Sequence, residues 1–229
     1  MGRLPDKLGY AYWCPEKDDL ISHTFLSCLV KLTRNPGFYL LLGSLQFFLL
    51  LLIAESLRPG YSVSLNYLSD LGVGPEPSRT LFNATLIIFG LSGFVASYLF
   101  WKTLVRNAMV VTLVISSIGV IGVGMFPEDT GAPHSLFALL GFFFGALTAI
   151  ISYKIVKPPY SWFGVVLGLT SMVSLFLYVG GTYLGLGAGG MERLVLYPSL
   201  LWYVGLGGCL LHPEEKHDNG TNPRESGHK

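Results

Sequence analysis

Six long apolar stretches run through the chain and limit what it can fold into. An α-helix crosses the roughly 30 Å hydrocarbon core of a bilayer with about 20 apolar residues. None of the stretches alternates apolar and polar residues as the strands of a transmembrane barrel do, so each is predicted to be a helix. They are Phe38–Ala54, Leu81–Trp101, Ala108–Phe126, Ser135–Tyr153, Trp162–Leu184 and Leu194–Leu211.

The predicted fold is therefore all-α: an integral membrane six-helix bundle over residues 38–211. Charged residues make up only 13% of the chain, whereas a soluble globular domain has about a quarter. The N-terminal arm, 1–37, is expected to lie in the cytoplasm. Its apolar residues between Asp19 and Arg34 follow helical spacing, which predicts an interfacial amphipathic helix. We favour a simple anchor for it over a partner-binding helix. The polar tail, 212–229, is predicted to be disordered and cytoplasmic.

The basic residues predict the orientation in the cell membrane. Three of the 15 Lys and Arg residues, Arg58, Arg79 and Arg193, fall on one side of the predicted spans. Cytoplasmic loops carry an excess of basic residues, so the side with the other basic residues, which includes both termini, is predicted to be cytoplasmic. Those residues are Arg3, Lys7, Lys17, Lys31, Arg34, Lys102, Arg106, Lys154, Lys157, Lys216, Arg224 and Lys229.

Polar residues that could form a site gather at the opposite, outer face. Ser62, Asn66 and Asp70 are spaced four apart, which predicts one face of a short helix that Gly72 ends. Polar groups at membrane depth are costly and often mark function. The candidate residues are Asn66, Ser69, Asp70, Asn83, Glu128, Asp129, His134, Glu192 and Arg193.

This cluster has two interpretations of comparable weight. In the first it is a structural latch, with Asp70, Glu128 or Glu192 paired to Arg193 or Arg79 and the asparagines capping helix ends. In the second it lines a pocket for a lipid headgroup or a metal ion.

Three functions follow from the second interpretation and from the arm. The favoured one is a non-enzymatic or lipid-handling membrane protein that binds a lipid headgroup or a partner at the cluster, with Arg193 suited to a phosphate. The next is a metal-dependent lipid hydrolase or transferase that uses Asp70, His134 and one of Glu128, Asp129 or Glu192. The third is an accessory subunit of a larger membrane complex. We expect membrane lipid as a partner, with a membrane protein as the alternative, and no nucleic acid; the sequence indicates no particular cofactor.

Small residues recur at helical spacing within the spans. Gly141, Gly145 and Ala149 form one stripe and Gly164 and Gly168 another, which predicts close helix packing. The glycine-rich run 185–190 predicts a mobile loop between the last two spans. The cysteines, Cys14, Cys28 and Cys209, have neither metal-ligand nor disulfide-framework spacing.

The polar blocks also carry a family resemblance. From Tyr39 to Leu211 the chain resembles the domain of unknown function 998 family, and it is more remotely similar to the DRAM, Frag and Sfk membrane families, some of which are linked to lipid handling. The resemblance implies a six-span fold and a site at these residues, without a reaction. The blocks are Asn66–Gly72, Phe82-Asn83, Gly119–Asp129 followed by His134, and Glu192-Arg193 before a final span with Trp202.

Overall fold

The computed structural model describes residues 29–103 and 108–211, and in these ranges it contains helices and no strands. Six helices are long and apolar enough to cross a membrane, which confirms the predicted all-α six-span fold. Short 3-10 helices η1 (Ser69–Gly72), η2 (Glu128–Thr130) and η3 (Ser152–Lys154) join some of them. The six are α2 (Pro36–Ser56), α3 (Ser78–Lys102), α4 (Ala108–Met125), α5 (Ala132–Ile151), α6 (Tyr160–Val179) and α7 (Gly187–Leu211).

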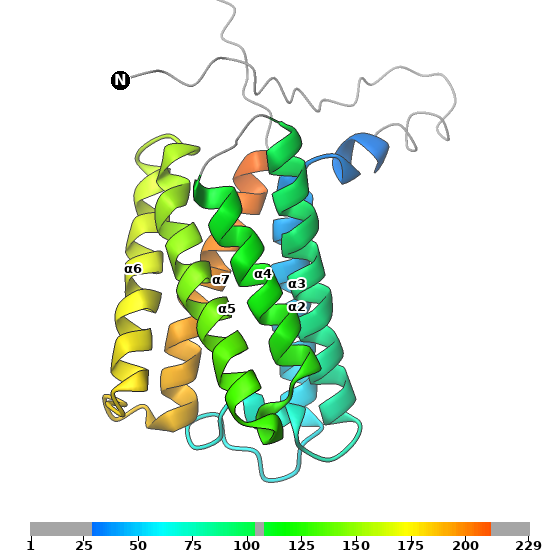
Figure 1. The fold of residues 1–229 in the computed structure, drawn as a ribbon, viewed down its shortest axis with the longest axis vertical. Helices are drawn as coiled ribbons and strands as arrows, with labels where there is room; N and C mark the ends of the chain where they lie inside the picture. The colour runs from blue at the N-terminus through cyan, green and yellow to red at the C-terminus, as the bar shows by residue number, and fades with distance from the viewer. Residues whose placement is uncertain (1–28, 104–107, 212–229) are drawn as a thin grey trace, which may run out of the picture.

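The helices run alternately up and down and form a closed ring (Figure 1). Each packs against the next along the chain, and α7 returns to pack against α2. Segments 57–77, 126–131 and 180–186 lie together at the lower end in Figure 1, which we call the loop end. The described chain begins and finishes at the opposite end. The ring therefore brings residues from distant parts of the sequence together at the loop end.

Glycines permit the close helix contacts, as their spacing predicts. A Cβ atom on Gly119 would lie 2.3 Å from the backbone nitrogen of Gly141, and one on Gly164 would lie 2.6 Å from Cε2 of Trp202. These distances are too short for any side chain. In a bilayer, where lipid tails are as apolar as the helices, such close van der Waals packing drives helix association.

Asn35 fastens the two ends of the ring together. Its Oδ1 accepts a hydrogen bond from the Gly37 backbone N–H at 2.8 Å, which caps α2, and its Nδ2 donates to the carbonyl of Leu210 at 2.9 Å. Pro36 follows in the first helical turn, where a missing N–H costs nothing. Most of the predicted amphipathic helix lies outside the described residues, although 29–33 are helical. The tail, 212–229, and Cys14 and Cys28 also lie outside them.

The last helix differs most from its predicted bounds. It begins at Gly187 rather than at Leu194, and α6 ends at Val179 rather than at Leu184. Pro198 lies within α7 and has no N–H for the carbonyl of Leu194. The next residue, Ser199, donates its backbone N–H to Oγ of Ser171 on α6 at 3.1 Å. Contacts with a neighbouring helix thus support α7 at the proline.

Candidate functional site

Arg193 is the centre of a buried network at the loop end. It lies in the second turn of α7 and is only 5% exposed. Its Nη2 forms an ion pair with Glu55 at the end of α2 and donates to the hydroxyl of Tyr61 at 2.8 Å. Its Nη1 donates to the carbonyls of Val63 at 2.8 Å and Gly189 at 3.0 Å. Both Nη atoms are therefore held by internal partners, while Nε is buried without a hydrogen-bond partner. Arg193 thus does not present the free fork of donors that its predicted role as a phosphate ligand needs.

Tyr61 extends this network into segment 57–77. Burial raises the pKa of Tyr61 to about 12, and the neighbouring Arg193 only partly opposes this increase. The phenol therefore stays neutral and serves as both donor and acceptor. It accepts from Arg193 and donates to the carbonyl of Tyr67 at 2.9 Å.

The start of α7 is held against segment 57–77 by backbone contacts. The carbonyl of Ser64 accepts the Gly189 N–H at 2.9 Å. A Cβ atom on Gly189 would lie 1.9 Å from the carbonyl oxygen of Asn66, so only glycine fits there. The prediction of a mobile loop over 185–190 is therefore wrong from Gly187 onward, because these glycines allow the helix to dock on the loop.

Asp70 and Asn66 hold each other in place. The Oδ2 atom of Asp70 accepts from the Tyr67 N–H at 2.9 Å and from Nδ2 of Asn66 at 3.1 Å, while Oδ1 of Asn66 accepts from the Ser62 N–H at 3.0 Å. The predicted helix through all three residues is wrong, since Ser62 and Asn66 lie in a non-helical segment of turns and bends, but Asp70 lies in η1, which ends at Gly72 as predicted. Side-chain bonds to the backbone replace the helical pattern, although the residues spaced four apart do meet.

Two further candidates also lie away from a binding cavity. Asn83 is inside α3, and its Nδ2 donates to the carbonyl of Gly72 at 3.0 Å, which fastens η1 to that helix. Asp129 is exposed on η2. Arg193, Asn66, Asp70 and Asn83 thus make internal contacts, as the latch interpretation expects, but the predicted partners are wrong. The ion pair of Arg193 is made with Glu55, and Asn83 lies inside α3 instead of capping its end.

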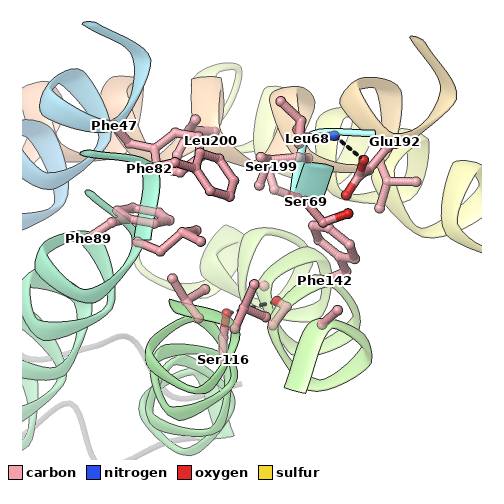
Figure 2. A pocket seen from close by; sticks show the side chains of 18 of the residues that line it. Phe47, Leu68, Ser69, Phe82, Phe89, Ser116, Phe142, Glu192, Ser199 and Leu200 are labelled. Atoms are coloured by element: carbon pink, nitrogen blue, oxygen red, sulfur yellow. Dashed lines mark hydrogen bonds between the residues drawn. The ribbon is translucent and has the colours of Figure 1, made fainter. Parts of the chain in front are cut away.

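The other candidates surround a cavity inside the ring. Its volume is about 70 Å³, and residues of α2, α3, α4, α5, α7 and the Leu68-Ser69 segment line it. Figure 2 shows Phe47, Phe82 and Phe89 toward one side, with Ser69 and Glu192 at the other. Phe142 lies beside Ser69 in the same view, so the cavity is aromatic at one side and carries polar atoms next to one phenylalanine at the other, which we call the polar side. A smaller cavity of about 20 Å³ adjoins it and shares the lining residues Phe89, Ser116, Val120 and Tyr203.

Glu192 and His134 supply the ionisable groups of the cavity lining. Glu192 is 5% exposed, and its Oε2 accepts from the Leu68 N–H at 2.6 Å (Figure 2). His134 is 8% exposed, and its Nδ1 lies 2.9 Å from the carbonyl of Phe126. A carbonyl oxygen only accepts hydrogen bonds, so Nδ1 carries a proton, and in this tautomer Nε2 is an acceptor.

Glu128 lies beside the polar side of the cavity. Burial raises the pKa of the Glu128 carboxyl, and the negative charge of Asp70 raises it further, whereas the Ser69 hydroxyl and His134 act in the opposite direction. Its Oε2 is buried without a hydrogen-bond partner. Glu128 therefore adds an unsatisfied acceptor next to Ser69 and His134.

The residues that surround the cavity do not form a metal centre. Within 29–103 and 108–211, no group of three or more His, Cys, Asp or Glu side chains is arranged to hold a metal ion. The predicted metal-dependent hydrolase would need such a set of ligands. The described residues therefore give that alternative no support.

Sequence reasoning missed Glu55, Tyr61 and the three phenylalanines. Glu55 follows an otherwise apolar span, and an acidic residue at such a position could have been predicted to pair with a buried basic residue. Tyr61 and the phenylalanines carry no comparable signal, because aromatic residues are frequent throughout such helices. Only the ring closure shows which of them face the cavity.

The fold and the site together define a multi-pass α-helical membrane protein with an interior cavity near one end. The family described as "Protein of unknown function (DUF998)" matches residues 41–208, and the chain belongs to this family. The match spans all nine candidate residues and confirms the resemblance in the sequence. No curated protein and no solved structure matches the chain, and the remote similarity to the DRAM, Frag and Sfk families is not confirmed.

Proposed function

We propose that this protein binds a membrane amphiphile, with the polar head of the ligand at Glu192, His134 and Ser69 and its first carbons between the phenylalanines. The observation that carries the proposal is the two-sided character of the cavity. Phe47, Phe82 and Phe89 offer apolar surface, while Glu192 and His134 offer buried polar atoms. A small set of polar groups in a mostly apolar cavity is typical of ligand sites.

The volume limits what the cavity accepts. An engineered cavity of about 150 Å³ holds benzene, so the about 70 Å³ here takes a polar head and a few carbons. The adjoining smaller cavity, which shares Phe89 and Tyr203, gives the hydrocarbon chain a direction in which to continue. The predicted location in the cell membrane, with cytoplasmic termini, would place the head group near the outer leaflet.

Butanol is a suitable uncharged probe for this site. Binding is measured by ligand-observed NMR with the protein in lipid nanodiscs. Ala138 lines the cavity on α5, and we expect Ala138→Phe to fill the void and abolish saturable binding. Leu139, the next residue, is 47% exposed, so Leu139→Phe is the matched control and should bind as the wild type does.

Two results would contradict the proposal. One is butanol binding that is not saturable in the wild type beyond partition into empty nanodiscs. The other is equal saturable binding in the wild type and in Ala138→Phe, because the ligand would then occupy a different place.

A further inference from the structure

The polar side of the cavity carries acidic groups without a cation. Glu192 lines the cavity and Glu128 adjoins it, whereas the lining contains neither Lys nor Arg. Two guanidinium groups have recorded contacts near this side: that of Arg193 is paired with Glu55, and that of Arg58 donates to the backbone carbonyl of Asp70. An uncompensated carboxylate in an apolar interior is costly, so this side of the cavity favours a positive ligand group.

The hydrogen bonds at this side are short of donors as well. The Leu68 N–H is the donor that reaches Glu192, and Oε2 of Glu128 receives none. His134 uses its Nδ1 proton on the carbonyl of Phe126, which leaves Nε2 as an acceptor. Asp70, by contrast, accepts two hydrogen bonds from segment 57–77. At this side the unpartnered Oε2 of Glu128 and Nε2 of His134 are acceptors, whereas the unpartnered Nε of Arg193 lies outside the cavity lining. A ligand at this side can therefore supply donors.

We infer that the amphiphile bound in the cavity carries a primary amine head, whose ammonium group donates to Glu192, Glu128 and His134. An ammonium has three N–H donors and one positive charge, which matches three acceptors and the excess of negative charge. A hydroxyl has one donor and no charge, and a phosphate or carboxylate would be repelled by Glu192 and Glu128. This inference rests on the proposed function and specifies its ligand class.

The test compares butylamine, butanol and butyrate, which share a chain length and differ in the head group. Competition for the cavity is measured by ligand-observed NMR with the protein in nanodiscs of zwitterionic lipid. We expect butylamine to bind at least about tenfold tighter than butanol, the size of effect that charge-assisted hydrogen bonds give in a buried site, and butyrate not to compete.

A conservative variant separates charge from packing. Glu192→Gln keeps the shape and a carbonyl oxygen for the Leu68 N–H, so the fold should be retained. We expect the ratio of butylamine affinity to butanol affinity to fall toward one in this variant, whatever its effect on butanol binding itself. Leu139→Phe is again the matched control and should keep the preference.

The outcomes distinguish the two proposals. If butylamine and butanol bind equally, or if the preference survives in Glu192→Gln, the inference of an amine head is contradicted. The proposal that the protein binds an amphiphile would then still stand. Saturable binding of neither compound would overturn both.

Discussion

The Glu55 carboxylate on α2 and the Arg193 guanidinium on α7 form a buried ion pair that closes the helix ring at the loop end. They are 138 residues apart in the chain, and the two side chains are 13% and 6% exposed. The pair sits beside the polar side of the cavity without lining it. The pair therefore holds α2 and α7 together next to the cavity and is not part of the cavity surface.

Removal of one partner of this pair should be costly. Arg193→Met would leave Glu55 buried without its cation, and we expect the free energy of unfolding to fall by about 3 kcal/mol or more, as for other buried pairs. The measurement is unfolding in mixed micelles by titration with denaturing detergent. Arg79→Met changes an exposed arginine at the same end and should have an effect within about 0.5 kcal/mol.

A double variant tests whether the pair itself is responsible. Glu55→Gln should cost less in the Arg193→Met background than in the wild type, because the partner is already missing. Strictly additive losses would show that Arg193 stabilises the fold only through Tyr61 and the loop carbonyls.

The contact between α7 and segment 57–77 should depend on Gly189. A Cβ atom there would lie 1.9 Å from the backbone oxygen of Asn66, so Gly189→Ala must displace the backbone. We expect a loss of about 1–3 kcal/mol, the usual range for overpacking, measured by the same titration. Gly208, on the same helix, has no atom within 4 Å of an added Cβ, so Gly208→Ala should cause no loss. Equal effects in both variants would contradict the docking role of Gly189.

Asn35 should stabilise the protein through two separate bonds. Asn35→Ala removes both the hydrogen bond that caps α2 at Gly37 and the hydrogen bond to the carbonyl of Leu210. We expect the free energy of unfolding to fall by about 1 kcal/mol for the cap alone, and further because the Leu210 carbonyl loses its donor. Asn35→Ser keeps an oxygen for the cap and should lose less. Indistinguishable melting temperatures for the two variants would show that the cap contributes nothing.

Glu128 should make stability depend on pH. A carboxyl whose pKa is raised by folding binds more protons in the folded state, so its contribution to stability falls as pH rises through that pKa. Because burial raises the pKa of Glu128 above its ordinary value of 4.5, Glu128→Gln should gain stability relative to the wild type as pH rises from about 4 into the neutral range. Melting temperatures across this range provide the measurement.

The neighbouring carboxyl provides the control for this pH trend. Asp129 is exposed on the same short helix, and Asp129→Asn removes the same formal charge. An equally large trend in Asp129→Asn would show that the effect arises from general charge repulsion rather than from the buried position of Glu128.

The helices and the end of the bundle that carries the site could be predicted from the sequence. Length and hydropathy are local properties of the sequence, so the membrane-spanning helices could be predicted from them. Because successive helices cross in opposite directions, Ser69, His134 and Glu192 could also be placed at the same end of the bundle. The predicted start of the last helix was wrong, because the glycine-rich sequence from Gly187 is typical of a loop. It is helical in the structure, where the backbone of Ser64 and Asn66 packs against it.

The partners could not be predicted, because they depend on the closure of the ring. The sequence suggested Asp70, Glu128 or Glu192 as the partner of Arg193, and only the packing of α7 on α2 selects Glu55. That choice decides the chemistry of the site: Arg193 is paired with Glu55, and the Glu192 carboxyl faces a cavity whose lining contains neither Lys nor Arg. The sequence alone determined six membrane-spanning helices and a polar end, since hydrophobic length is read locally. The tertiary structure alone decided which polar groups are satisfied internally and which face the cavity, since that depends on contacts between residues far apart in the chain.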